Sequence, residues 1–220
     1  MRRVTADTPV QDVLIETDGE VFHGDLTVPQ NPTGLVVFAH GSGSSRLSPR
    51  NRFVAEVLVE SGQATLLVDL LTPGEERDRA NVFDVELLAH RLLSMTQWVQ
   101  ARPETHGIRL GYFGASTGAA AALVAAARSS TPIDAVVSRG GRPDLAGEWL
   151  PRVTAPTLLL VGGNDPVVLD LNRAAFDILT CEKRLEIVPG ASHLFEERGT
   201  LEAAAAFAAD WFDWFLTPPG

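Results

Sequence analysis

The sequence predicts a single α/β domain over residues 1–220, with a mostly parallel, doubly wound sheet of about eight strands and helices on both faces. Three observations support this prediction. A chain of 220 residues, 45% of them hydrophobic, can bury one sizeable core. After an initial hairpin pattern, strand-like runs alternate with helical patterns, as in a parallel sheet covered on both sides. The run Leu35-Val-Val-Phe-Ala39 is continuously apolar, which is typical of a strand buried on both faces.

The first part of the chain begins with an antiparallel hairpin. Strand patterns at 13–16 and 21–28 flank an Asp18-Gly19 turn. Buried strands are predicted at 35–39 and 64–69, with a helix over about 51–60 between them. A polar loop at 71–79 and an amphipathic helix over about 82–100 follow, the helix carrying its apolar residues on one stripe.

The rest of the chain repeats the alternation of strand and helix. Strands are predicted at 108–114, 133–138, 156–161 and 184–188. Helices are predicted at about 117–127, 169–180 and 200–215. Each later strand is therefore reached by a crossover, which is the arrangement of a parallel sheet.

Composition excludes several classes of protein. The net charge of −10 and the pI near 4.9 argue against a nucleic-acid partner, because phosphate backbones select basic surfaces. Cys181 is the only cysteine, so neither an intrachain disulfide nor a cysteine-based zinc site can form. The N-terminal segment has no apolar run typical of a secretory signal, and no segment approaches the roughly 20 apolar residues of a membrane span. We expect a soluble, cytoplasmic protein with no membrane partner.

The segment Gly114-Ala-Ser116-Thr-Gly118 joins a predicted strand to an alanine-rich helix. A chain that reverses from strand to helix within a few residues has no room for side chains at the flanking positions, and glycine fits there. Ser116 is then left at the apex with its hydroxyl exposed. The alternative is an ordinary glycine-rich turn. We predict that Ser116 is a catalytic nucleophile.

Two further polar residues follow predicted strands, Asp165 and His193. Ligands of parallel sheets bind beyond the carboxyl ends of the strands, and the chain order serine, acid, histidine matches a nucleophile elbow. The histidine would take the proton of the serine, and the carboxylate would hold the histidine in the required tautomer. Asp165 also suits a helix N-cap. Asp144 and Glu148 are the reserve candidates for the acid, and His40 is the rival base.

The loop His40-Gly-Ser-Gly-Ser-Ser-Arg46 leaves the strand at 35–39. Such a loop can present backbone N–H groups to an anion, but this one lacks both glycine-rich nucleotide-binding patterns. An oxyanion loop agrees better with the Ser116 elbow, and His40 would brace it. We expect the backbone N–H groups of Ser42 and Thr117 to form the oxyanion hole.

In this order, the motifs make the sequence resemble the α/β-hydrolase superfamily: His40-Gly-Ser-Gly, Gly114-x-Ser-x-Gly118, Gly163-Asn-Asp165 and Gly190-x-Ser-His193. Over nearly its whole length the chain is similar to the small dienelactone-hydrolase-like proteins. The resemblance implies an α/β-hydrolase fold, and about 17 residues between Ser138 and Pro156 leave no room for a cap domain. Dienelactone hydrolases carry cysteine at the elbow, where this chain has Ser116, so we expect a different substrate.

These observations predict a serine hydrolase that cleaves small carboxylic esters through an acyl-enzyme, with no metal or organic cofactor. The alternatives are a thioesterase or acyltransferase with the same triad, or a non-catalytic binding protein on the same fold. Without a cap, Leu70 and Trp149 would wall the site, and short acyl groups would be preferred. The partner is a small-molecule ester, and the sequence leaves a homodimer open.

Seven arginines lie in three loops beyond the predicted strand ends: Arg46, Arg50, Arg52, Arg77, Arg79, Arg139 and Arg142. A focused positive region would attract an anionic substrate, since guanidinium groups match carboxylates. Alternatively, neighbouring acids pair with these arginines, as Asp144 could with Arg142. Arg139 directly follows a strand and is the best candidate for a substrate contact.

Overall fold

The computed structural model describes residues 8–218, in which one eight-stranded sheet has the order β1-β2-β4-β3-β5-β6-β7-β8. The strands are β1 (Val10–Thr17), β2 (Glu20–Thr27), β3 (Gly34–Ala39), β4 (Gln63–Val68), β5 (Leu110–Ala115), β6 (Ala135–Arg139), β7 (Thr157–Gly162) and β8 (Lys183–Val188). The segment 1–7, which covers most of the region searched for a secretory signal, lies outside the described residues.

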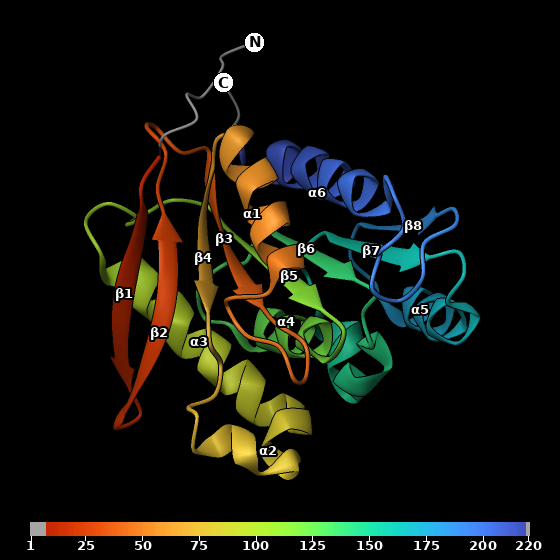
Figure 1. Ribbon diagram of the computed structural model, residues 1–220, viewed down its shortest axis with the longest axis horizontal. Helices are drawn as coiled ribbons and strands as arrows, with labels where there is room; N and C mark the ends of the chain where they lie inside the picture. The colour runs from red at the N-terminus through yellow and green to blue at the C-terminus, as the bar shows by residue number, and fades with distance from the viewer. Residues whose placement is uncertain (1–7, 219–220) are drawn as a thin grey trace.

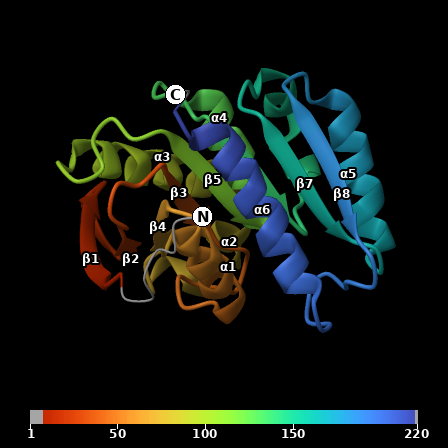
Figure 2. The same ribbon diagram turned by 90° about the horizontal axis from the view of Figure 1, so that it is seen from above.

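Helices cover both faces of the sheet (Figure 1). One face is covered by α1 (Pro49–Glu60) and α6 (Thr200–Leu216), and Figure 2 shows α6 crossing over the strands. The other face is covered by α3 (Val85–Ala101), α4 (Thr117–Arg128), the 3₁₀ segment η2 (Pro143–Arg152) and α5 (Pro166–Ile178). Each face has its own apolar cluster, as the continuously apolar strands require. This confirms the predicted α/β architecture.

The sheet is parallel except at β2, which runs antiparallel to both β1 and β4. The β1–β2 turn has positive φ at Asp18 (55°) and Gly19 (78°), as a tight hairpin turn with its favoured twist requires. Strands β3 to β8 all run in one direction. Their carboxyl ends therefore meet at one edge, where the loops with the candidate functional residues begin.

The structure differs from the predicted elements between β4 and β5. The helix predicted over about 82–100 is two helices, α2 (Arg79–Phe83) and α3, and the polar loop contains the short 3₁₀ turn η1 (Glu75–Arg77). The break falls at Asp84, whose carboxylate accepts a hydrogen bond from the Leu87 N–H at 3.0 Å and caps α3. Among the described residues, no helix is long and apolar enough to cross a bilayer.

Candidate active site

Ser116 lies between β5 and α4 in a strained backbone conformation, with φ 52° and ψ −122°. Such a conformation costs about 1–3 kcal/mol and persists only where the surroundings enforce it. Close packing enforces it here. A Cβ at Gly118 would overlap the Ala39 carbonyl oxygen, and a Cβ at Gly114 would overlap the Ala119 backbone. The structure thus has the elbow geometry, with Ser116 at its apex.

His193 and Asp165 come together from loops that follow β8 and β7. His193 Nδ1 lies 2.7 Å from Asp165 Oδ2. Asp165 occupies the N-cap position of α5, but its side chain makes no capping hydrogen bond, so the carboxylate serves His193 instead. Because Nδ1–H donates to the carboxylate, Nε2 is the nitrogen that can accept a proton from a hydroxyl.

The end of β6 joins Ser116 to His193. The Ser116 N–H donates to the Arg139 carbonyl at 3.3 Å. The next residue, Gly140, has φ 52°, and a Cβ there would lie 3.1 Å from the His193 carbonyl oxygen and 3.7 Å from its Cε1. Within residues 8–218 no hydrogen bond joins Ser116 Oγ to His193; such contacts often tighten only when substrate binds.

The reserve candidates have other partners. Asp144 pairs with Arg142 through two hydrogen bonds of 2.9 and 2.8 Å, and Glu148 is an exposed side chain 4.0 Å from Arg152. His40, the rival base, is buried between two loops. Its Nδ1 contacts the Gly41 carbonyl at 3.1 Å, and its Nε2 accepts the Leu70 N–H at 3.2 Å. Both ring nitrogens are therefore occupied in bracing the loops.

The predicted oxyanion hole is only partly in place. Thr117 is the first residue of α4, so its N–H has no partner within the helix and lies at the positive end of the helix dipole. The Ser42 N–H instead donates to Thr117 Oγ1 at 2.9 Å. Sequence spacing cannot reveal this contact. The prediction for Ser42 thus needs a correction: its N–H reaches an oxyanion only after the Thr117 hydroxyl releases it.

Two expected substrate contacts are not at the site. The Leu70 side chain is fully buried (0% exposed), and its neighbour Leu71 lines the cavity instead. The Trp149 Nε1–H donates to Glu86, and its ring lies 5.4 Å from the guanidinium carbon of Arg128. Arg128 ends α4, about 17 Å along the helix axis from its first residue. Trp149 therefore packs at the far end of α4 from Ser116.

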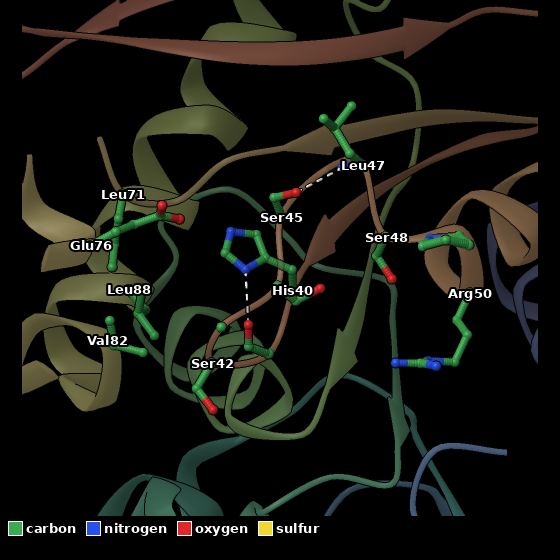
Figure 3. Close-up of a pocket in the computed structure, with 14 residues that line it drawn as sticks. His40, Ser42, Ser45, Leu47, Ser48, Arg50, Leu71, Glu76, Val82 and Leu88 are labelled. Carbon is green, nitrogen blue, oxygen red and sulfur yellow. Dashed lines mark hydrogen bonds between the residues drawn. The ribbon is translucent and has the colours of Figure 1, made fainter. Parts of the chain in front are cut away.

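A cavity of about 570 Å³ opens beside the oxyanion loop (Figure 3). One wall consists of Leu71, Val82 and Leu88, from the β4–α3 connection and α3, and Glu76 places a carboxylate beside Leu71 (Figure 3). Its polar side consists of the loop 40–48 and the start of α1, with the residues His40, Gly41, Ser42, Gly43, Ser44, Ser45, Ser48, Pro49 and Arg50. The short β6–β7 connection contributes nothing to these walls.

Most of the arginines considered as anion contacts are paired internally. Arg46 bonds both Asp25 (3.2 Å) and Asp69 (2.8 Å), and Arg52 bonds Asp25 at 2.9 Å. These pairs tie the oxyanion loop and α1 to β2 and β4. Among residues 8–218, Arg77, Arg79 and Arg139 have no carboxylate within 4.0 Å, so the acids next to Arg77 and Arg79 do not pair with them. Arg77 and Arg79 are exposed, whereas Arg139 is buried.

The loop that carries His193 is held by residues that the sequence did not single out. The exposed carboxylate of Glu197 accepts the Ser192 N–H at 2.9 Å, and this bond helps to lower the pKa of Glu197. Phe195 is buried with a positive φ of 56°. No local signal marks a phenylalanine for that conformation, which tertiary packing imposes.

Comparison with known proteins identifies the class. The profile of the dienelactone hydrolase family matches residues 22–217, so the chain belongs to this family. A crystal structure of a dienelactone hydrolase from Anabaena variabilis is 53% identical, with a TM-score of 0.91 over 94% of this chain and 98% of that one. Est1E from Butyrivibrio proteoclasticus is 17% identical, with a TM-score of 0.80 over 94% of this chain and 99% of its own, and shares the fold. The predicted family and α/β-hydrolase fold are confirmed, and they support a hydrolase.

Curated relatives add a second observation. Proteins of two Mycobacterium tuberculosis strains, named as candidate phosphoribosyl transferases, are 60% identical over 217 residues. The match covers 98% of this chain but 49% of theirs. The chain thus spans about half the length of these relatives.

Proposed function

We propose that the protein is a serine hydrolase that cleaves small carboxylic esters with Ser116, His193 and Asp165. The observation that carries this proposal is the 2.7 Å contact between His193 and Asp165, at the same sheet edge as the strained Ser116. A hydroxyl is a weak nucleophile until a base takes its proton, and the pair supplies that base.

In the first half of the reaction, Ser116 Oγ attacks the ester carbonyl while His193 Nε2 takes its proton. The carboxylate of Asp165 stabilises the imidazolium that forms. The negative charge on the carbonyl oxygen develops next to the Thr117 N–H at the start of α4. His193 then protonates the alcohol oxygen, which leaves, and the acyl group stays on Ser116.

In the second half, His193 takes a proton from water, and the hydroxide attacks the acyl-enzyme. The carboxylic acid leaves, and Ser116 regains its proton from His193. If a thiol ester enters, or another nucleophile replaces water, the same residues act as a thioesterase or an acyltransferase. Nothing in the geometry favours either alternative over hydrolysis.

Labelling with a fluorophosphonate probe tests the nucleophile. We expect the wild type to be labelled covalently, and Ser116→Ala to lose both the label and at least about 10³-fold of the ester hydrolysis rate. Ser138→Ala is the matched control, because Ser138 lies in the neighbouring strand β6 and its buried hydroxyl has no hydrogen-bond partner among residues 8–218. Labelling of the Ser116→Ala variant would show that the nucleophile is elsewhere. A wild type without any label would support the non-catalytic alternative.

The phosphoribosyl transferase name belongs to proteins about twice as long as this chain. We assign the transferase activity that this name describes to the half of those proteins that this chain does not span. The half that this chain does span matches a hydrolase family. We therefore expect no nucleotide formation from phosphoribosyl pyrophosphate and a nucleobase. Formation of a nucleotide by this chain would contradict the assignment.

A further inference from the structure

Arg139 is a buried cation without a counter-charge. Its side chain is 7% exposed, and its Nε has no hydrogen-bond partner among the described residues. Its Nη2 donates one long bond of 3.4 Å, to Asn51 Oδ1 in the first turn of α1. Buried charges are normally paired, because removing them from water is costly. The described residues therefore provide no negatively charged partner for this guanidinium, and a bound anion could take that place.

A second cation and a helix start lie close to Arg139, whose bond to Asn51 places it at the first turn of α1. Arg50, the second residue of α1, lines the cavity, and Figure 3 shows its guanidinium turned back toward the middle of the view. Burial, and then repulsion from Arg50, lower the pKa of Arg139 to about 10. In the part of the chain that the structure describes, the one acid paired with Arg50 is Glu196, at 3.4 Å between exposed side chains. The positive end of the α1 dipole adds to this field.

The cavity that Arg50 lines also carries serine hydroxyls, and its one lining carboxylate is that of Glu76. Ser48 Oγ accepts the Asn51 N–H, and Ser45 Oγ accepts the Leu47 N–H, so the hydroxyl protons of both remain free to donate. A carboxylate offers two oxygens and one charge. A phosphate monoester offers three oxygens and a charge of about −1.5 to −2 at neutral pH. Two guanidinium groups, a helix start and hydroxyl donors match the phosphate better.

An anion bound to Arg139 would lie on the side of the leaving group. His193 must reach the oxygen of the departing alcohol, so the alcohol part of an ester lies near His193. The guanidinium carbon of Arg139 is 5.6 Å from the ring of Phe195, two residues beyond His193.

We propose that Arg139, Arg50 and the start of α1 bind the phosphate of a substrate whose alcohol part is a phosphate monoester. This inference rests on the proposed function and names its substrate class. The phosphate is not cleaved. Ser116 Oγ bonds to the acyl carbon, the ester C–O bond breaks, and the phosphorylated alcohol leaves with a proton from His193. Water then releases the carboxylic acid.

Binding is tested without chemistry in the Ser116→Ala variant. Titration calorimetry should show that glycerol 3-phosphate binds, and that glycerate and glycerol bind at least about tenfold more weakly. Adding Arg139→Met, or separately Arg50→Gln, should weaken phosphate binding by about thirtyfold or more. Arg142→Met is the matched control: it removes an arginine from the same loop that is already paired with Asp144, and should leave binding unchanged. Equal affinity for glycerol 3-phosphate and glycerol would overturn the proposal, as would full binding by both variants.

Kinetics of the wild type then connect the site to the reaction. Acetate release is compared for the acetyl esters of glycerol 3-phosphate, glyceric acid and glycerol. We expect the highest kcat/KM for the phosphate ester, and Arg139→Met should reduce that preference. Hydrolysis of all three at equal kcat/KM would overturn the phosphate site while leaving the esterase function intact. Phosphate binding with no hydrolysis of any ester would refute the esterase function and keep the anion site.

Discussion

Replacing Arg139 by methionine should stabilise the protein when no anion is present. Methionine keeps much of the side-chain volume and removes the buried charge. Burial and the nearby Arg50 lower the pKa of Arg139 to about 10. Each tenfold change in proton affinity is worth about 1.4 kcal/mol, so the charged form is destabilised by roughly 3 kcal/mol in the folded state. Because the folded-state pKa lies below the unfolded-state value, this cost is present in full at every pH well below 10.

Two favourable contacts of Arg139 offset part of that gain. The contact with the Phe195 ring is worth about 1 kcal/mol, and losing the long bond to Asn51 leaves a buried oxygen unpaired at about 1 kcal/mol. The net gain is therefore about 1 kcal/mol. For a chain of this length that raises Tm by about 2–4 °C.

The assay is thermal unfolding followed by circular dichroism, in a buffer free of phosphate and sulfate, at pH 6, 7 and 8. We expect the same rise in Tm at all three pH values. Adding glycerol 3-phosphate should raise the Tm of the wild type by more than that of the variant, which binds it more weakly. A variant that melts below the wild type in the anion-free buffer would refute the reasoning, since Arg139 would then be a net stabilising residue.

Three further predictions concern catalysis. Asp165→Asn should lower kcat by about 10³–10⁴-fold, because His193 is then no longer held in the required tautomer. Asp170→Asn, on the exposed face of α5, is the control and should keep the wild-type kcat. An Asp165→Asn variant with the wild-type kcat would exclude Asp165 as the acid. Thr117→Val removes the hydroxyl that accepts the Ser42 N–H, and this N–H then becomes free to bind the oxyanion. We expect kcat in steady-state ester assays to rise by about threefold to tenfold and Tm to fall, because one hydrogen bond is lost. A lower kcat would mean that the hydroxyl holds the loop in place. Among p-nitrophenyl esters, butyrate should exceed laurate in kcat/KM because no cap extends the cavity, and the reverse order would contradict this.

The candidate triad shows how far sequence reasoning reaches. Ser116, Asp165 and His193 each directly follow a predicted strand, so their common edge follows from a parallel sheet without any knowledge of distances. The choice between Asp165 and Asp144 rested on chain order alone. The structure gives the physical reason. Asp144 is paired with Arg142, whereas the Asp165 side chain makes no capping bond to α5 and binds His193 instead.

The corrected site predictions all concern groups whose surroundings come from distant parts of the chain. Trp149 was expected at the site because its loop follows β6, but the ring packs on Arg128 and bonds to Glu86. The Ser42 N–H is taken by a hydroxyl 75 positions away. Leu70 and Leu71 are neighbours in sequence, yet only Leu71 faces the cavity.

The sequence by itself determined the fold class, the family and the elbow, because apolar periodicity and glycine spacing are local properties that the backbone must satisfy. Only the tertiary structure decided which charges are neutralised. Arg46 meets Asp25 and Asp69 across 21 and 23 positions, whereas Arg139 is buried with no carboxylate within 4.0 Å in the described part of the chain. Those pairings depend on which strands and helices become neighbours. The sequence therefore does not show that Arg46 is paired or that Arg139 is buried beside the candidate site.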